Sequence, residues 1–193
     1  MGYKVITPVA APIIALDVLR PHLRLDLIGG LTHPDDALIQ AYLAAAREYA
    51  EHYTQRSVGQ QVIELALDSF PDAGIPGIEL PLGAASITSI KYTDAALVEQ
   101  TIASNLYILD DYSFKHWAIP VNAWPTTGAF ANAVKVRYTT PAAIPAAVNN
   151  ALLLLTGHLY ENREAVNTDR GVNPGEVPLG VKALLDTVRR WSL

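Results

Sequence analysis

The sequence predicts an α+β fold, in which a helical core (a long amphipathic helix plus C-terminal helices) holds an inserted antiparallel β-sheet region. Apolar residues recur at helical spacing up to about residue 54 and again from residue 145, whereas the segment between them alternates with a period of two. Short strands separated by turn residues favour an antiparallel sheet over a nucleotide-binding parallel one. We therefore divide the chain into residues 1–57 (arm and helical core), 58–140 (β-rich insertion) and 141–193 (C-terminal helices).

The N-terminal residues are expected to precede the regular fold. Pro8 and Pro12 predict that residues 1–12 form an extended arm outside any sheet, because proline cannot donate a backbone hydrogen bond. Residues 15–25 carry leucines at near-helical spacing, and Pro21 interrupts them. A short helix in two pieces is therefore expected here.

A long helix is predicted next, ending near Thr54. Thr32 or His33 can cap it, and Pro34 suits its first position. The two aspartates that follow would lie at the positive end of the helix dipole. The apolar side chains form two adjoining lines, which makes the helix amphipathic. These lines are Leu38, Tyr42, Ala45, Tyr49 and Tyr53, and beside them Ile39, Leu43, Ala46 and Ala50.

Seven short strands are expected in the insertion. They are 62–67, 78–80, 86–92, 98–102, 106–109, 117–119 and 133–138. In the last of these, Val134, Val136 and Tyr138 alternate with two basic residues, a pattern typical of a half-solvated strand. Glycine, proline and aspartate clusters between the strands mark turns.

Two helices are predicted in the C-terminal part. The first begins at Pro145, runs to Asn162 and is apolar nearly all round, so it should be packed on several sides. A polar loop follows at residues 167–177, and Pro178 then opens an amphipathic helix. The apolar stripe of this last helix consists of Val181, Leu184, Leu185, Val188 and Trp191.

Composition excludes several classes of protein. The 193 residues contain no cysteine, which rules out a disulfide framework, a thiolate zinc site and a cysteine nucleophile. No apolar stretch approaches the ~20 residues that cross a bilayer, and we expect neither a signal peptide nor a membrane partner. The 14 basic residues are scattered among 19 acidic ones, for a net charge of −5. Tight binding of nucleic acid is therefore not expected.

Catalytic motifs are also missing from the sequence. There is no phosphate-binding loop, dinucleotide-binding turn, nucleophile elbow or zinc-protease helix. His158 and Glu161 would share a helix face, but they supply only two metal ligands. Asp35–Asp36 fits a helix start, and Asp110–Asp111 are strand neighbours whose side chains point apart. We expect no catalytic residue, no metal and no cofactor.

The tyrosines of the long helix have two interpretations. Tyr42, Tyr49 and Tyr53 could stack bases of single-stranded nucleic acid. At helical spacing they are better explained as core or subunit-interface residues, because a tyrosine ring can be buried while its hydroxyl reaches a polar rim.

Taken in order, several segments resemble the head–tail connector (head-completion or adaptor) proteins of tailed phages and gene transfer agents. The resemblance covers most of residues 14–166, and no single piece of it is diagnostic. The segments are 17–26, 35–54, 63–71, 78–82, 86–94, 98–101, 136–138, 144–145 and 151–165.

This resemblance implies a structural subunit of the virion that has no catalytic residues. Such proteins form a homo-oligomeric ring, commonly a dodecamer, under the portal protein at the capsid vertex. The ring continues the channel for double-stranded DNA, which passes without sequence-specific binding, and it docks a tail stopper or tail-terminator protein. The chain would be made in the host cytoplasm and end at the head–tail junction.

The resemblance also directs the hypotheses about sites. We expect the stripe from Val181 to Trp191 (with Leu184, Leu185 and Val188) to dock on the portal as a C-terminal tail. Tyr42, Tyr49 and Tyr53 are the candidates for the ring interface. Two other functions remain open: a DNA-packaging (terminase-associated) factor, which would need a basic helix-turn-helix, and a small hydrolase with an undetected site.

Overall fold

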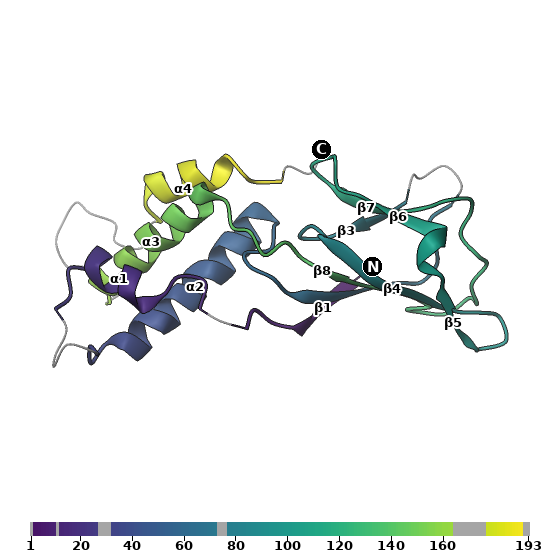
Figure 1. The fold of residues 1–193 in the computed structure, drawn as a ribbon, viewed down its shortest axis with the longest axis horizontal. Helices are drawn as coiled ribbons and strands as arrows, with labels where there is room; N and C mark the ends of the chain where they lie inside the picture. Colours follow the sequence, from purple (N-terminus) through teal and green to yellow (C-terminus); the bar gives the residue numbers. More distant parts are fainter. Residues whose placement is uncertain (1, 11, 27–31, 73–76, 164–176, 191–193) are drawn as a thin grey trace. The chain divides into compact units, whose positions relative to one another are not determined.

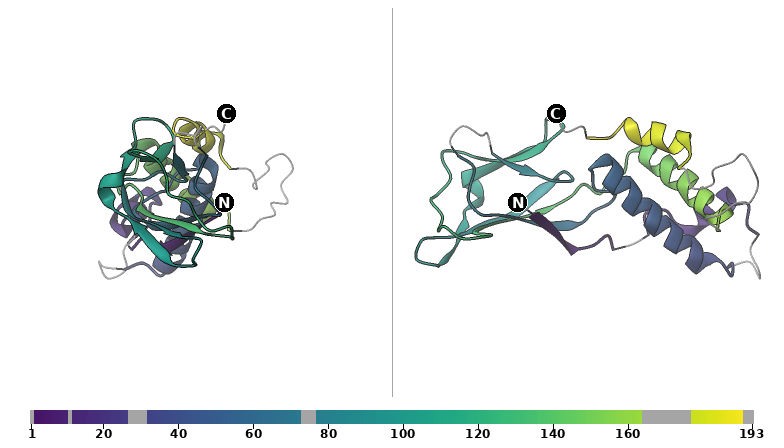
Figure 2. Two further views of the ribbon diagram at one scale, coloured as in Figure 1. Left: turned by 90° about the vertical axis from the view of Figure 1, so that its right-hand side faces the viewer. Right: turned by 180° about the vertical axis from the view of Figure 1, so that it is seen from behind.

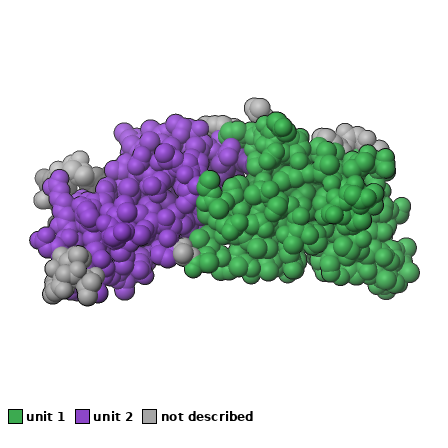
Figure 3. Space-filling view, viewed as in Figure 1, with its two compact units in different colours: residues 1–10, 59–143 green, residues 11–58, 144–193 purple. Residues whose placement is uncertain are grey.

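The chain forms two compact units in the computed structural model (Figures 1 and 2). The structure describes residues 2–10, 12–26, 32–72, 77–163 and 177–190. The sheet unit comprises residues 1–10 and 59–143, and the helical unit comprises residues 11–58 and 144–193 (Figure 3). Among the described residues, every α-helix belongs to the helical unit and every strand to the sheet unit. The predicted α+β fold with an inserted antiparallel region is confirmed.

The sheet unit contains two antiparallel sheets. The first has the strand order β1-β2-β8-β4-β5 and the second the order β3-β7-β6. The strands are β1 (Gly2–Thr7), β2 (Val62–Leu67), β3 (Ile78–Leu80), β4 (Ser86–Thr93), β5 (Glu99–Ile102), β6 (Tyr107–Asp110), β7 (His116–Pro120) and β8 (Val134–Thr139), with a short 3-10 helix at Ser104–Leu106. All seven strands expected in the insertion are present, with ends within one residue of the predicted ones.

The N-terminal residues were predicted wrongly as an unpaired arm. β1 pairs antiparallel with β2, so that Tyr3 lies opposite Leu65 and Lys4 opposite Glu64. The strand ends at Thr7, before Pro8, and the missing proline donor therefore costs the sheet nothing. Residues 1–10 consequently belong to the sheet unit rather than to the helical core.

The two sheets share one hydrophobic core, to which each contributes its inner face. Tyr138 lies fully buried in this core, and its hydroxyl donates a hydrogen bond to the Pro81 carbonyl oxygen at 2.7 Å. Phe70 stacks on Trp124 with ring centroids 4.8 Å apart. Because the inner faces of the two sheets pack in this shared core, the opposite face of each sheet points away from it.

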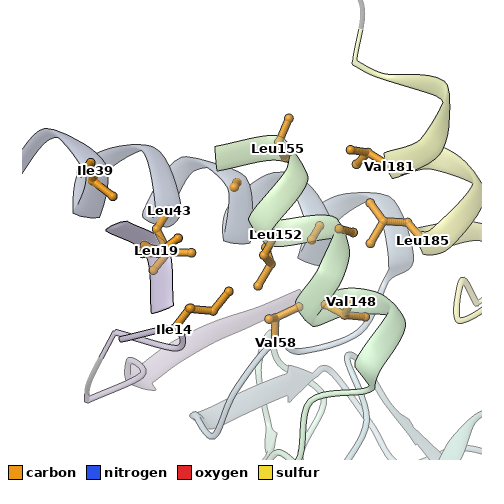
Figure 4. Packing of buried hydrophobic residues seen from close by; sticks show 13 residues of the cluster. Ile14, Leu19, Ile39, Leu43, Val58, Val148, Leu152, Leu155, Val181 and Leu185 are labelled. Carbon is orange, nitrogen blue, oxygen red and sulfur yellow. The ribbon is translucent and has the colours of Figure 1, made fainter. Parts of the chain in front are cut away.

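In the described part of the helical unit, four helices pack around a second core (Figure 4). They are α1 (Leu16–His22), α2 (Asp36–Thr54), α3 (Ala146–Glu161) and α4 (Leu179–Asp186). As predicted, α3 is packed on several sides, since it contacts the other three helices, as α2 also does. Of the two apolar lines on α2, the one containing Ile39 and Leu43 is buried, whereas the tyrosine line is partly exposed.

Two details of α1 and α2 differ from the prediction. α1 is one helix with Pro21 inside it, because proline in the last turn removes only one internal donor. α2 begins at Asp36 rather than at Pro34, and Asp35 is its N-cap residue. The Asp36 carboxylate accepts a hydrogen bond from the backbone N–H of His33 at 3.0 Å, which closes a separate turn before the helix.

Candidate interaction surfaces

The predicted portal-docking stripe on α4 lies against the chain's own core. Val181 and Leu185 are fully buried, and Leu184 and Val188 pack partly buried against the same cluster. Trp191 lies outside the described residues. While α4 keeps this packing, Val181 and Leu185 cannot reach a partner, because burial in the core uses their surface.

The three tyrosines predicted for a ring interface have different surroundings. Tyr49 and Tyr53 stack at 5.8 Å between centroids and pack against the helical core. The Tyr53 hydroxyl donates a hydrogen bond to Asp186 Oδ1 at 2.8 Å, and this bond to a carboxylate raises the pKa of Tyr53. The Arg189 guanidinium lies 4.7 Å from the centre of the same ring. Tyr42 is half-buried, and a role in the ring remains a prediction for all three.

The two aspartates at the start of α2 hold helices together. Arg20 on α1 donates two hydrogen bonds to the Asp36 carboxylate, at 2.8 and 2.6 Å. This ion pair, aided by the His33 N–H, lowers the pKa of Asp36 from 3.8 to about 2. Tyr160 and Arg163 both donate to Asp35 Oδ2 at 2.6 Å, and the Tyr160 hydroxyl is the first cause of a lowered Asp35 pKa. The pair therefore lies at the helix start, as predicted, and both carboxylates have side-chain partners from other segments, which the sequence did not predict.

Two further kinds of site can be assessed in the described residues. They contain no group of three or more histidine, aspartate or glutamate side chains placed to hold a metal ion. His158 instead shares hydrogen bonds with Asn162, whose amide donates to the His158 carbonyl oxygen at 2.8 Å. In the same part of the chain, no helix has the length and apolar character needed to span a membrane.

The outer face of the three-stranded sheet has an apolar part around Ile108 and Ile119, beside Glu79 and Asp110, which lie opposite Trp117. Ile108 on the edge strand β6 lies opposite Ile119 on β7 and is 55% exposed. Leu106 and Val121 continue this row and are joined by a backbone hydrogen bond, and both are about half exposed. Trp117 lies further along β7 and is half-buried. Exposed apolar area on an edge strand is typical of a protein interface.

The outer face of the five-stranded sheet is charged. Its described strands present Lys4, Lys91, Lys135 and Arg137 beside the carboxylates of Glu64 and Glu99. Lys4 and Arg137 both pair with Glu64, and the bond from Arg137 is the main cause of the lowered Glu64 pKa. The amine of Lys91 lies 2.7 Å from a Glu99 carboxylate oxygen. The face thus has a small excess of positive charge in an acidic chain.

The sequence predicts one of these faces in part, because Lys135 and Arg137 lie on the expected solvated side of their strand. The exposed apolar face is not predicted, although a signal for it is present. Trp117, Ile119 and Val121 alternate along the chain, as do Leu106 and Ile108. Alternation shows that residues share a face, but it does not show whether that face is covered. The covering element for this sheet lies on its other side, which the sequence pattern alone does not reveal.

Comparison with known proteins shows where this fold occurs. No protein-family model matches the chain, and no curated protein matches it. A chain in the structure "Virion of native gene transfer agent (GTA) particle" superposes with a TM-score of 0.78 at 23% identity, covering 100% of this chain and 97% of the other.

Two further solved structures contain similar chains. In "Neck of empty GTA particle computed with C6 symmetry" the TM-score is 0.75 and the identity 24%. In "Neck of native GTA particle computed with C12 symmetry" the values are 0.73 and 22%. Coverage is again 100% of this chain and 97% of the other chain in both. At these identities the likeness shows a shared fold.

Proposed function

We propose that this chain is a structural head–tail connector (adaptor) subunit of a tailed phage or gene transfer agent particle. In this role it forms a homo-oligomeric ring under the portal protein, continues the channel for double-stranded DNA and docks the tail or its stopper. It acts in the virion, at the head–tail junction, and performs no catalysis.

The observation that carries this proposal is the fold match over the whole chain. Similar chains occur in structures of a GTA virion and of GTA necks computed with C6 and C12 symmetry, and those symmetries support a ring of copies. The ordered sequence segments that resemble connector proteins point to the same role independently. The exposed apolar face of the three-stranded sheet supports assembly, because a lone chain gains nothing from keeping it in water.

The net charge of the chain supports a channel through which DNA passes, rather than a protein that binds DNA tightly. A net charge of −5 disfavours lasting phosphate contacts, which would slow DNA in proportion to their number. Passing DNA is therefore proposed as cargo of the ring and not as a sequence-specific ligand.

Electron microscopy of particles made with and without this protein tests the proposal. We expect that particles lacking it have DNA-filled heads and no tails, because packaging precedes the step that the connector serves. Empty heads would instead indicate a DNA-packaging factor, and normal tailed particles would contradict both roles. Restoring the wild-type gene in trans is the control, since it should return tailed particles.

A further inference from the structure

The outer face of the five-stranded sheet contains a hollow of about 600 Å³. Gly2 lies opposite Ala66, and Ala66 lies opposite Lys135, so one row across the sheet is nearly without side chains in its first two strands. A Cβ atom added to Gly2 would meet nothing within 4 Å. Lys4 and Lys135 line the hollow together with the ring of Phe130. The floor is small and apolar, and the rim carries two lysines, the Glu64 carboxylate and the side chain of Phe130.

The cations of this rim are only partly neutralised. Lys4 lies 3.0 Å from a Glu64 carboxylate oxygen, but that carboxylate also serves Arg137. Lys135 is exposed, lies opposite a second lysine (Lys91) and forms no ion pair with any described residue. An acidic partner would therefore gain electrostatic attraction at this rim.

The hairpin tip, residues 111–115 between β6 and β7, carries the carboxylate of Asp111, and its one cation, Lys115, is paired with Glu79. Tyr112 at the tip is fully exposed. Asp110 Oδ1 accepts a hydrogen bond from the Tyr112 N–H at 3.1 Å, and the Ser113 hydroxyl donates to the Lys115 carbonyl oxygen. These bonds fix the turn, so the tyrosine is presented on an ordered support beside the exposed carboxylate of Asp111.

We propose that the hairpin tip of one copy inserts Tyr112 into the hollow of the next copy in the ring. This contact rests on the ring assembly proposed above and assigns the residues that join neighbouring copies. The tyrosine ring would lie on the Gly2–Ala66 floor, and Asp111 would face Lys135. A buried tyrosine removes on the order of 150–250 Å² from water and is among the strongest anchors of protein interfaces.

The geometry of the contact suits a ring. Tip and hollow are different patches on the same sheet unit, so each copy offers one of each. Such a heterologous contact leaves a free tip at one end of a row and a free hollow at the other, and it is satisfied completely only when the row closes.

A copy of the chain fits this hollow better than DNA does. Three of the four cations on the face, Lys4, Lys91 and Arg137, are already paired with carboxylates. A DNA strand would need several free cations, and only Lys135 of the four lacks an ion pair with a described residue, whereas the tip needs one cation for its single Asp111 carboxylate and a hollow for its tyrosine. The DNA alternative remains an outcome of the test below.

Cysteine cross-linking tests the contact directly, because the wild-type chain contains no cysteine. In the variant with Ser113→Cys at the tip and Ala131→Cys at the hollow, which keeps Tyr112 and the Gly2–Ala66 floor, we expect intermolecular disulfides that link copies into closed rings. The matched control combines Ser113→Cys with Thr101→Cys, which lies on the same outer face but at its β5 edge, and should not cross-link. Failure of the first pair in assembled rings would overturn the contact.

A charge-swap experiment provides the second readout. Asp111→Lys and Lys135→Glu should each weaken ring assembly about tenfold, and the double variant should recover most of that loss, because it restores opposite charges. Analytical ultracentrifugation measures assembly. Both side chains are exposed, so circular dichroism and thermal melting should match the wild type.

The outcomes separate this contact from the proposed function. If the Asp111→Lys variant assembles into rings as well as the wild type does, the contact is overturned and the connector role remains intact. Normal rings that deliver DNA poorly after Lys135→Glu would assign the face to DNA instead. A chain that forms no ring, in solution or on particles, overturns the connector role together with the contact.

Discussion

Asp36 joins two helices through a single side chain. Its carboxylate accepts both hydrogen bonds from Arg20 and a third from the His33 N–H. These bonds favour the ionised form, which is why the pKa falls from 3.8 to about 2. The folded chain therefore releases this proton more readily than the unfolded chain. The resulting stabilisation is complete above about pH 4 and is lost as the pH falls towards 2.

We predict that Asp36→Asn lowers stability at neutral pH and reduces the further loss between about pH 4 and pH 2. Urea unfolding at a series of pH values measures both effects. Glu48→Gln is the matched control, because Glu48 is exposed on the same helix and makes no hydrogen bond or ion pair with a described residue. Equal pH dependence in Asp36→Asn and the wild type would contradict the assigned role of the ion pair.

Helix α4 was expected to dock on the portal, but most of its apolar stripe packs in the helical core. Val181 and Leu185 are fully buried there. Leu179, the first residue of the same helix, is 83% exposed. The helix thus offers a buried and an exposed leucine for comparison.

We predict that Leu185→Ala destabilises the chain by about 2–5 kcal/mol, because it removes buried methyl groups and leaves a cavity. Leu179→Ala should change stability by less than about 0.5 kcal/mol. Chemical denaturation distinguishes the two. A Leu185→Ala variant with wild-type stability but lost attachment to filled heads would return this residue to the docking hypothesis.

The elements also show what periodicity can and cannot predict. The strands of the insertion were predicted closely, because Val134, Val136 and Tyr138 alternate without ambiguity. β1 was missed because Pro8 and Pro12 were weighed against pairing, although the strand ends before the first of them. The hollow was out of reach, since it depends on Gly2 lying opposite Ala66, a pairing of residues more than sixty positions apart.

Across the molecule, the net charge and the local charge of one sheet face have opposite signs. The chain is acidic overall, while the outer face of the five-stranded sheet has a local excess of lysine and arginine. Local complementarity can therefore orient copies in a ring even though their net charges repel. We expect ring assembly by this contact to weaken with added salt only in part, since the tyrosine anchor is apolar.

The order of segments has a mechanical consequence. The chain passes between its two units three times, after residues 10, 58 and 143. A force that pulls one unit from the other is therefore divided among three covalent connections that act in parallel, and breaking any one of them leaves two in place. In a subunit proposed to connect a head and a tail, three parallel connections would keep the two units joined if one of them broke.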